Sequence, residues 1–188
     1  MRICIFGASA DDLDPRFVSE TERLGEALAK RGHSLIFGGG AHGMMGAAAR
    51  GFTAGGGHIT GVAPRFFDLP GVIYQQCDAF VWPDSMRDRK KYMEDNADAF
   101  IICPGGVGTY EEFFEVLTLK QLGRHTKPIA VFNIAGFYDR LLGLLKENAE
   151  EGIVRAQTLE LYGVTATVDE TVDFVETDRT DPARIRFY

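Results

Sequence analysis

The segment Pro104-Gly-Gly-Val-Gly-Thr109 is the part of the sequence that most directly suggests chemistry. It joins a short apolar run to a helix-like pattern, and a glycine-rich turn that opens a helix presents backbone N–H groups and the positive helix end to an anion. The segment therefore predicts a phosphate site, in preference to a tight turn in which Thr109 only caps the helix. Because no Gly-Lys-Ser/Thr follows, it is not a Walker A loop, and the cation for a phosphate must come from elsewhere.

Carboxylates follow this turn at helical spacing. At 100° per residue, Glu112 and Glu115 share one stripe with the apolar Val116. Glu111 lies in the first turn, where a carboxylate is usually a partner of the helix dipole. Acidic groups on a partly apolar face suit work on a cationic or protonated transition state, so we expect Glu112 and Glu115 to act one turn from the phosphate site.

A basic segment supplies the missing cation. On a helix, Arg89 and Lys90 flank an apolar seam that also carries Met86, whereas Arg87 and Lys91 point away from it. A solvated basic patch explains the outward pair, and the inward pair could also extend its alkyl chains along the seam. The chain has 20 Lys and Arg against 27 Asp and Glu, a net charge of −7. In such a chain a focused pair of cations indicates a small anionic substrate.

The elements that must position these residues follow from alternating apolar and helical patterns. Buried strands are expected at residues 2–6, 34–37, 58–63, 98–102 and 128–132, with weaker candidates at 78–82 and 161–166. Helices are expected between them, at residues 15–31, 43–54, 84–97, 109–122, 137–151 and 169–176. This alternation predicts an α/β protein with a doubly wound parallel sheet in three α/β/α layers. We expect a single domain over residues 1–176 and a polar C-terminal tail over residues 177–188.

Glycines, 22 in 188 residues, gather after three of these strands, at Gly7-Ala8-Ser9, Gly38 to Gly43 and Gly105 to Gly108. In a doubly wound sheet, ligands bind beyond the carboxyl ends of the strands, so the three clusters predict a ligand cleft rather than tight turns alone. Gly38-x-Gly40-x-x-Gly43 also matches the dinucleotide fingerprint. It follows the second strand instead of the first, and no acidic residue ends the next strand, so we do not expect NAD.

The sequence also argues against several classes of protein. The acidic net charge is unlike that of a nucleic-acid-binding protein. The three cysteines and four histidines show no metal-ligand spacing, which predicts reduced thiols, no metal site and a cytoplasmic protein. No apolar run approaches the roughly 20 residues of a membrane helix, and the N-terminus lacks the layout of a signal peptide. We therefore expect no membrane association.

Longer motifs relate the chain to a known family. Pro104 to Glu112 completes the pattern Pro-Gly-Gly-x-Gly-Thr-x-x-Glu, and Met86 to Lys90 carries an Arg-Lys element, with Arg87 in the place of the customary His. Further matches are Gly38-Gly39-Gly40-x-x-Gly43-x-Met45-Gly46, Gln121-Leu122-Gly123-x-His125-x-Lys127-Pro128-Ile129 and Asn133-x-x-Gly136-Phe137-Tyr138. Over about residues 1–176 the sequence resembles the LOG ("lonely guy") family of cytokinin riboside 5′-monophosphate phosphoribohydrolases, long mislabelled as lysine decarboxylases.

The resemblance implies a Rossmann-like homodimer that needs no cofactor. It would hydrolyse the N-glycosidic bond of a purine nucleoside 5′-monophosphate, releasing the free base (cytokinin or adenine) and ribose 5-phosphate. The family's catalytic residues map onto Arg89 and Glu112. The substrate-binding residues expected with them are Ser9, Gly39, Gly40, Met45, Lys90, Gly105, Gly106, Val107, Gly108, Thr109, Tyr110, Glu111, Glu115 and Thr118. At the first turn the family commonly has Cys-Gly-Ser where this chain has Phe6-Gly7-Ala8-Ser9.

Two other functions fit parts of the sequence. A nucleotide- or molybdopterin-binding carrier would use the same cleft without turnover, but it needs no carboxylate facing a sugar, so the pair Arg89 and Glu112 favours an enzyme. Amino-acid decarboxylation would need a lysine that forms a Schiff base with pyridoxal phosphate, and nothing marks Lys90 or Lys127 for that role. No recognisable motif distinguishes N6-modified from plain purine substrates.

Overall fold

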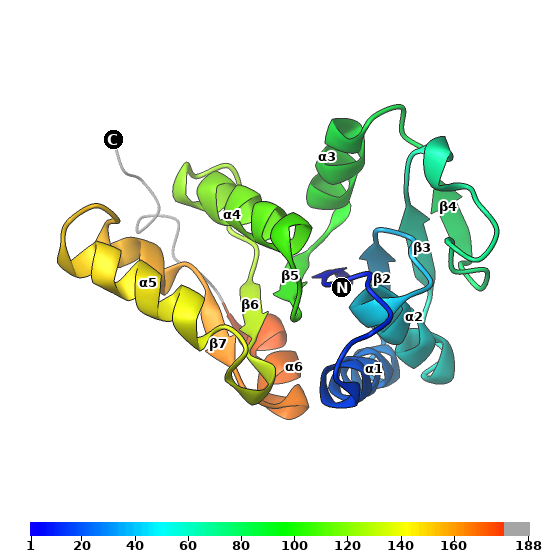
Figure 1. Ribbon diagram of the computed structural model, residues 1–188, viewed down its shortest axis with the longest axis horizontal. Helices are drawn as coiled ribbons and strands as arrows, with labels where there is room; N and C mark the ends of the chain where they lie inside the picture. The colour runs from blue at the N-terminus through cyan, green and yellow to red at the C-terminus, as the bar shows by residue number, and fades with distance from the viewer. Residues whose placement is uncertain (179–188) are drawn as a thin grey trace.

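The computed structural model describes residues 1–178, and within this range the strands form one parallel sheet (Figure 1). The sheet has seven strands in the order β4-β3-β2-β1-β5-β6-β7, and every neighbouring pair is parallel. Their bounds are β1 (Arg2–Phe6), β2 (Ser34–Phe37), β3 (Ile59–Val62), β4 (Ala79–Val81), β5 (Ala99–Ile102), β6 (Ile129–Phe132) and β7 (Gly163–Thr165). All the strands expected from the sequence are therefore present, including the two weaker candidates.

Helices cover both faces of the sheet, as the alternating pattern predicts. One face packs against α1 (Pro15–Lys30), α2 (Gly43–Ala54) and α6 (Val168–Thr177). The other face packs against α3 (Met86–Asn96), α4 (Val107–Gln121) and α5 (Asp139–Glu150). Short 3-10 helices follow β3, β6 and α5, at Arg65–Phe67, Ile134–Gly136 and Ala156–Glu160.

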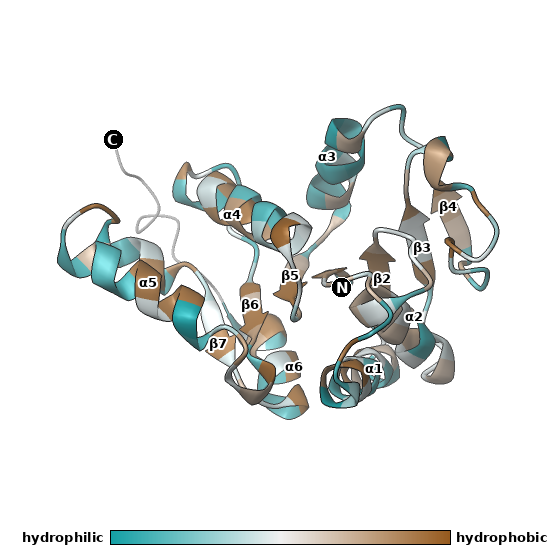
Figure 2. Ribbon diagram, viewed as in Figure 1, coloured by the Kyte–Doolittle hydropathy of each residue, from teal (hydrophilic) through white to brown (hydrophobic). Residues whose placement is uncertain are grey.

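The two faces of the sheet carry two hydrophobic clusters. Leu28 of α1 and Phe52 of α2 belong to one cluster, and Met93 of α3 and Phe113 of α4 belong to the other. Because the inner strands are buried on both sides, they read as continuous apolar runs instead of alternating ones. Figure 2 shows β2, β5 and β6 in hydrophobic colours and α3 as largely hydrophilic. The doubly wound α/β fold predicted from the sequence is confirmed.

The helix ends show where sequence signals worked and where they failed. Asp14 caps α1 by accepting a hydrogen bond from the backbone N–H of Arg16, Pro15 is the first helical residue, and Gly32 beyond the helix has a φ of 79°. The start of α4 differs from the prediction, because the helix begins at Val107 with Gly106 as its N-cap. Thr109 is therefore a buried residue of the first turn and not the helix cap.

Strand order fixes where a ligand site belongs. β1 pairs with β2 on one side and with β5 on the other, so the direction of strand progression reverses at β1. The three glycine clusters follow these same strands, β1, β2 and β5. Their turns therefore meet beyond the carboxyl edge of the sheet at the topological switch point, the usual ligand position in this fold.

Two further expectations concern the ends of the chain and the membrane. The expected tail, residues 177–188, begins at the last residue of α6, and its residues 179–188 lie outside the described part of the chain. Among the helices of the described residues, none has the length and apolar character needed to cross a membrane.

Candidate active site

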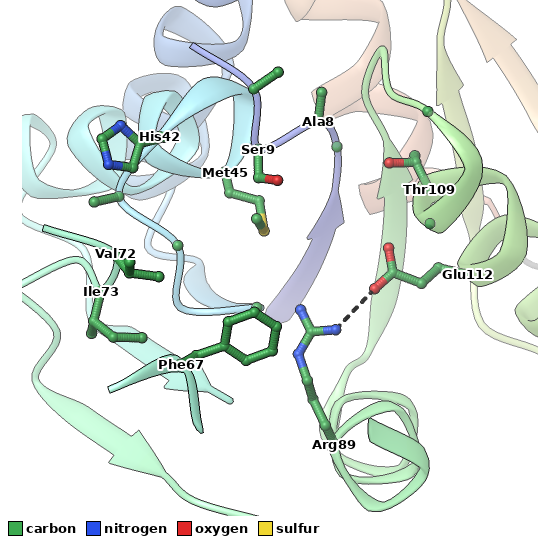
Figure 3. Close-up of a pocket in the computed structure, with 17 residues that line it drawn as sticks. Ala8, Ser9, His42, Met45, Phe67, Val72, Ile73, Arg89, Thr109 and Glu112 are labelled. Atoms are coloured by element: carbon green, nitrogen blue, oxygen red, sulfur yellow. Dashed lines mark hydrogen bonds and ion pairs between the residues drawn. The ribbon is translucent and has the colours of Figure 1, made fainter. Parts of the chain in front are cut away.

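A cavity of about 510 Å³ lies at the switch point (Figure 3). Its walls come from the turns after β1 and β2, the loop between β3 and β4, one face of α3 and the first turns of α4. The sequence segments that carry the glycine clusters and the Arg-Lys element therefore converge on one cavity. Its volume lies within the range usual for small-molecule sites.

Arg89 and Glu112 face each other across one end of this cavity, as Figure 3 shows. A guanidinium nitrogen of Arg89, Nη1, lies 3.5 Å from Oε1 of Glu112, and the two side chains are only 9% and 13% exposed. Arg89 also donates a hydrogen bond from Nε to the backbone carbonyl of Val62 at the end of β3, at 3.0 Å. The cation is thereby held between a strand end and the carboxylate, with two of its donors satisfied.

The glycine turn after β2 makes room for this arginine. A Cβ atom at Gly38 would lie 1.9 Å from Nη2 of Arg89, so a larger residue would displace the guanidinium. Gly43 has a φ of 57°, and a Cβ there would lie 2.4 Å from the carbonyl oxygen of Ala8. The Gly38 to Gly43 turn is thus required for close approach of the chain to its neighbours, which accounts for its glycines without a dinucleotide.

Burial gives Glu112 unusual acid–base properties. Desolvation raises the pKa of its carboxyl group to about 7, although the nearby Arg89 guanidinium acts in the opposite direction. A carboxyl group with such a pKa exchanges its proton near neutral pH, which suits a general acid or base. Glu112 is therefore the carboxyl group of the cavity best placed for proton transfer or for stabilising a positive charge.

The turn for which the sequence predicts anion binding lies at the start of α4. Gly106 is an N-cap without a side chain, so it leaves the N–H groups of the first turn available to a ligand. Gly106 and Gly108 both line the cavity. Behind them, a Cβ at Gly105 would lie 2.1 Å from Oγ1 of Thr109, and Ala8 donates a backbone hydrogen bond to the carbonyl of Pro104. The turns after β1 and β5 are thus joined directly.

The residues predicted for the site divide into those that line the cavity and those that lie around it. The lining includes Arg89, Glu112, Ser9, Gly40, Met45, Gly106, Gly108 and Thr109. Outside it, Gly39 faces the ring of Phe80, Gly105 lies behind Thr109, and Tyr110 packs against Tyr138. Val107 and Thr118 are exposed on α4. Contact between the substrate and the residues of either group stays a prediction.

Lys90 lies beside the cavity in a network of carboxylates. It forms ion pairs with Glu111 and, at 2.6 Å, with Glu115, and its side chain is only 16% exposed. Burial alone would lower the pKa of Lys90, but the two carboxylates raise it, so the amine stays charged. Glu94 lies on α3, the same helix as Lys90. Burial and the neighbouring Glu115 raise the pKa of Glu94 to about 7. Lys90, Glu111 and Glu115, all predicted to bind substrate, are thus engaged with one another.

One prediction for α3 is wrong. Arg89 and Met93 are buried and Arg87 points outward, in agreement with the helical spacing. Met86, which was expected on the same apolar seam, is 41% exposed. It is the first residue of the helix.

Sequence reasoning missed a wall of the cavity. Phe67, Val72 and Ile73, from the loop between β3 and β4, line the side opposite Thr109 and Glu112 (Figure 3). His42, the residue before α2, lies on the same side. The Pro70-Gly71 pair signals a turn here, but no local pattern shows that the turn folds back onto the glycine turn after β2.

Comparison with known proteins identifies the family. A family profile described as "Possible lysine decarboxylase" matches residues 45–175. Cytokinin riboside 5′-monophosphate phosphoribohydrolase LOG2 of Arabidopsis thaliana is 37% identical over 153 residues, which are 81% of this chain and 72% of that protein. The chain belongs to the LOG family. A second LOG relative, the probable phosphoribohydrolase LOGL3 of Oryza sativa subsp. japonica, is 34% identical over 93% of this chain and 83% of its own length.

Solved structures place the LOG fold in a wider group. The molybdenum cofactor binding protein of Rippkaea orientalis superposes with a TM-score of 0.72 at 19% identity, covering 94% of this chain and 95% of that one. The molybdenum cofactor carrier protein of Chlamydomonas reinhardtii gives 0.71 at 21% identity, covering 93% and 95%. At these identities the likeness establishes a common Rossmann-like fold.

Proposed function

We propose that the protein hydrolyses the N-glycosidic bond of purine nucleoside 5′-monophosphates, releasing the free base and ribose 5-phosphate. The LOG relatives, at 34–38% identity, are named for this reaction on cytokinin riboside 5′-monophosphates. The observation that carries the proposal is the buried pair of Arg89 and Glu112. It lies in one cavity with the uncapped start of α4 on one side and an apolar wall on the other.

The three parts of a nucleotide match the three parts of the cavity. The 5′-phosphate fits the N–H groups around Gly106 and Gly108, where the helix dipole favours an anion. The ribose then lies beside Glu112, and the base extends toward the apolar wall of Val72 and Ile73. An apolar wall suits a flat purine and tolerates an apolar group on N6, which is consistent with both plain and N6-modified substrates.

The chemistry follows from the charges of the reacting bond. As the bond from C1′ to the purine nitrogen breaks, the electron pair leaves with the base and the sugar gains oxocarbenium character. Glu112 as a carboxylate stabilises that cation or activates the attacking water, whose oxygen forms the new bond to C1′ and whose lost proton ends on the departing purine nitrogen. Arg89 orients the nucleotide and offsets negative charge that develops nearby, and such a preorganised group supplies several kcal/mol. Water is the only co-reactant, so the reaction needs no cofactor.

We also propose that the protein acts as a cytoplasmic homodimer. Apolar side chains are exposed on the helices of the α3-α4-α5 face, among them Phe114 on α4 and Leu144 on α5, at 37% and 51% exposure. Burial of such groups against a second copy of the chain would remove apolar surface from water, which favours association. Cys4, Cys77 and Cys103 are free thiols, which fits a reducing compartment. Expression with a fluorescent tag in the source cells tests the location.

Incubation with AMP and with its N6-isopentenyl analogue, followed by chromatography of the free base, tests the reaction. The wild-type protein is expected to release base from at least one of them. Glu112→Gln should lower the rate 100-fold or more and leave nucleotide binding and folding intact. Glu147→Gln, on the exposed side of α5, is the matched control and should keep full activity. Wild-type protein that binds nucleotide but releases base from neither substrate would instead be a carrier.

A further inference from the structure

His42 makes two contacts that the proposed reaction does not use. It is the residue before α2, it lines the cavity, and both of its ring nitrogens have partners. Nε2 lies 2.7 Å from the backbone carbonyl oxygen of Gly71, in the loop between β3 and β4. Nδ1 lies 2.6 Å from Oδ1 of Asp11, in the loop between β1 and α1. One imidazole ring therefore connects two loops that belong to different parts of the chain.

The chemistry of the partners defines the role of the ring. A carbonyl oxygen and a carboxylate are both acceptors, so His42 satisfies both only when each ring nitrogen carries a hydrogen. Both ring nitrogens are thus occupied by contacts to the two loops. Because neither nitrogen is left to exchange a proton with a ligand, His42 is suited to positioning and not to acid–base catalysis.

The loop that His42 holds forms the apolar wall of the cavity. Its turn has Pro70 followed by Gly71 with a φ of 80°, and the N–H of Val72 donates to the carbonyl of Leu69, as in a type II turn. Beyond the turn, the loop lies against the glycine turn after β2. Ala41 donates to the carbonyl of Val72 at 2.9 Å, and a short antiparallel bridge joins Gly40 to Ile73. The contact from His42 to Gly71 extends this pairing to the tip of the loop.

We propose that His42 is the positioning residue for the base of the nucleotide. By fixing Gly71 relative to Asp11, it holds Val72 and Ile73 on the side of the cavity opposite Glu112, where the base is proposed to lie (Figure 3). This inference rests on the proposed function, because it assigns the base to this wall. It follows that His42 contributes to the affinity for ligands that carry a base and does not change the affinity for ribose 5-phosphate.

Kinetics of His42→Ala and Asp11→Ala with AMP test the assignment. Each variant is expected to raise KM about tenfold and to change kcat less than threefold. The double variant should raise KM no further than either single one, because both residues act through the same contact. Inhibition by ribose 5-phosphate should keep its wild-type constant within twofold. His58→Ala, at an exposed position before β3, is the matched control and should match the wild type in every measurement.

Several results would overturn the assignment. An unchanged KM in both single variants, or a fall in kcat at constant KM, would remove the positioning role. Equal loss of affinity for AMP and for ribose 5-phosphate would show that His42 affects binding of the ribose phosphate and not of the base. Hydrogen exchange of residues 68–74 tests this inference independently of the reaction. His42→Ala should accelerate hydrogen exchange in this loop whether or not the wild type hydrolyses AMP. Unaltered exchange there contradicts the connection, whereas a wild type without turnover contradicts only the proposed function.

Discussion

At the scale of single residues, Arg89 depends on groups that the chain supplies from distant positions. Burying a guanidinium is costly unless its charge is balanced and its N–H groups are bound. The carbonyl of Val62 and the carboxylate of Glu112 meet both needs, and the absence of a side chain at Gly38 gives the space. The position of the cation is therefore set by β3, α4 and the turn after β2 together.

Replacing Gly38 by Ala should displace the guanidinium of Arg89 and leave the rest of the fold stable. The new methyl group would lie 1.9 Å from Nη2 of Arg89, so the guanidinium must shift. A displacement of about 1 Å in a catalytic group lowers kcat/KM by roughly 100-fold. Gly143→Ala is the control, because nothing lies within 4 Å of a Cβ at that position in α5, and it should leave kcat/KM unchanged. Equal kinetics in the two variants would show that Arg89 tolerates the displacement.

The pKa of Glu112 has a consequence for stability as well as for chemistry. The carboxyl group titrates at about 7 in the folded protein and at 4.5 ordinarily, so between these pH values the folded state keeps a proton that the unfolded state has lost. The free energy of unfolding therefore falls as pH rises from about 4.5 to about 7, because Glu112 ionises more readily in the unfolded state than in the folded one. Glu112→Gln cannot ionise, so its stability relative to the wild type should increase by up to about 3 kcal/mol over this range.

Urea denaturation of both proteins at pH 5 and pH 8 measures this difference. Glu94, whose pKa is also raised to about 7, is present in both proteins, so its contribution cancels. Identical pH dependence of the two free energies of unfolding would mean that the carboxyl group of Glu112 is not desolvated in solution.

At the scale of elements, α3 combines contacts from Arg89 and Lys90 with hydrogen bonds at both of its ends. It buries only Arg89 and Met93 and is otherwise hydrophilic, as Figure 2 shows. At its start, Ser85 accepts a hydrogen bond from the backbone N–H of Asp88. At its end, Nζ of Lys127, from the loop before β6, donates to the carbonyl of Glu94 at 2.5 Å. These caps fix the helix that carries Arg89.

Lys127→Met should loosen the end of α3. It removes the donor to the last carbonyl groups, which should lower the free energy of unfolding by about 1–2 kcal/mol and accelerate hydrogen exchange of residues 93–97. Lys91→Met is the control, because Lys91 is exposed and its ion pair within residues 1–178 is with Asp95 on the same helix, a contact of the kind worth about 0.5 kcal/mol. If both variants lose the same stability, the cap from Lys127 makes no special contribution.

The elements were predictable because each one has a local cause. Buried parallel strands are continuous apolar runs, and α1 carries its own signals at Asp14 and Pro15. Helical spacing and the family motif both select Arg89 and Glu112, and the two side chains do meet in the cavity; their catalytic role stays a prediction. The apolar wall was not predictable, because Val72 reaches the cavity through backbone bonds to residues more than 30 positions earlier. Likewise, the engagement of Lys90 by carboxylates depends on how α3 packs beside α4.

At the scale of the whole molecule, the net charge of −7 affects which ligands bind, and the exposed apolar groups affect association with other chains. The charge disfavours contact with polyanions and leaves the cavity, with its buried cation, as the place for a small phosphorylated ligand. The apolar groups on α4 and α5, Phe114 and Leu144, are exposed to solvent. They support a second copy of the chain as the partner on these two helices.

Sedimentation of the purified protein tests the dimer. The wild type should sediment at twice the chain mass of 20.7 kDa, and the double variant Phe114→Glu and Leu144→Glu should sediment as a monomer, because a charge at a buried interface is costly. Val164→Glu, an equally apolar and 49% exposed position on the edge strand β7, is the control and should remain a dimer. A monomeric wild type would contradict the proposed assembly.

The division of the cavity between two stretches of chain has a consequence for how such enzymes diversify. Both proposed catalytic groups lie on one contiguous helix-strand-helix unit, α3-β5-α4, whereas the wall proposed to face the base comes from the turn after β2 and the loop between β3 and β4. Substitutions in the loop between β3 and β4 can therefore alter which purine is accepted, provided that Val62 and Gly38, which hold and accommodate Arg89, are kept. New substrate preferences in this lineage can arise without an inactive ancestor.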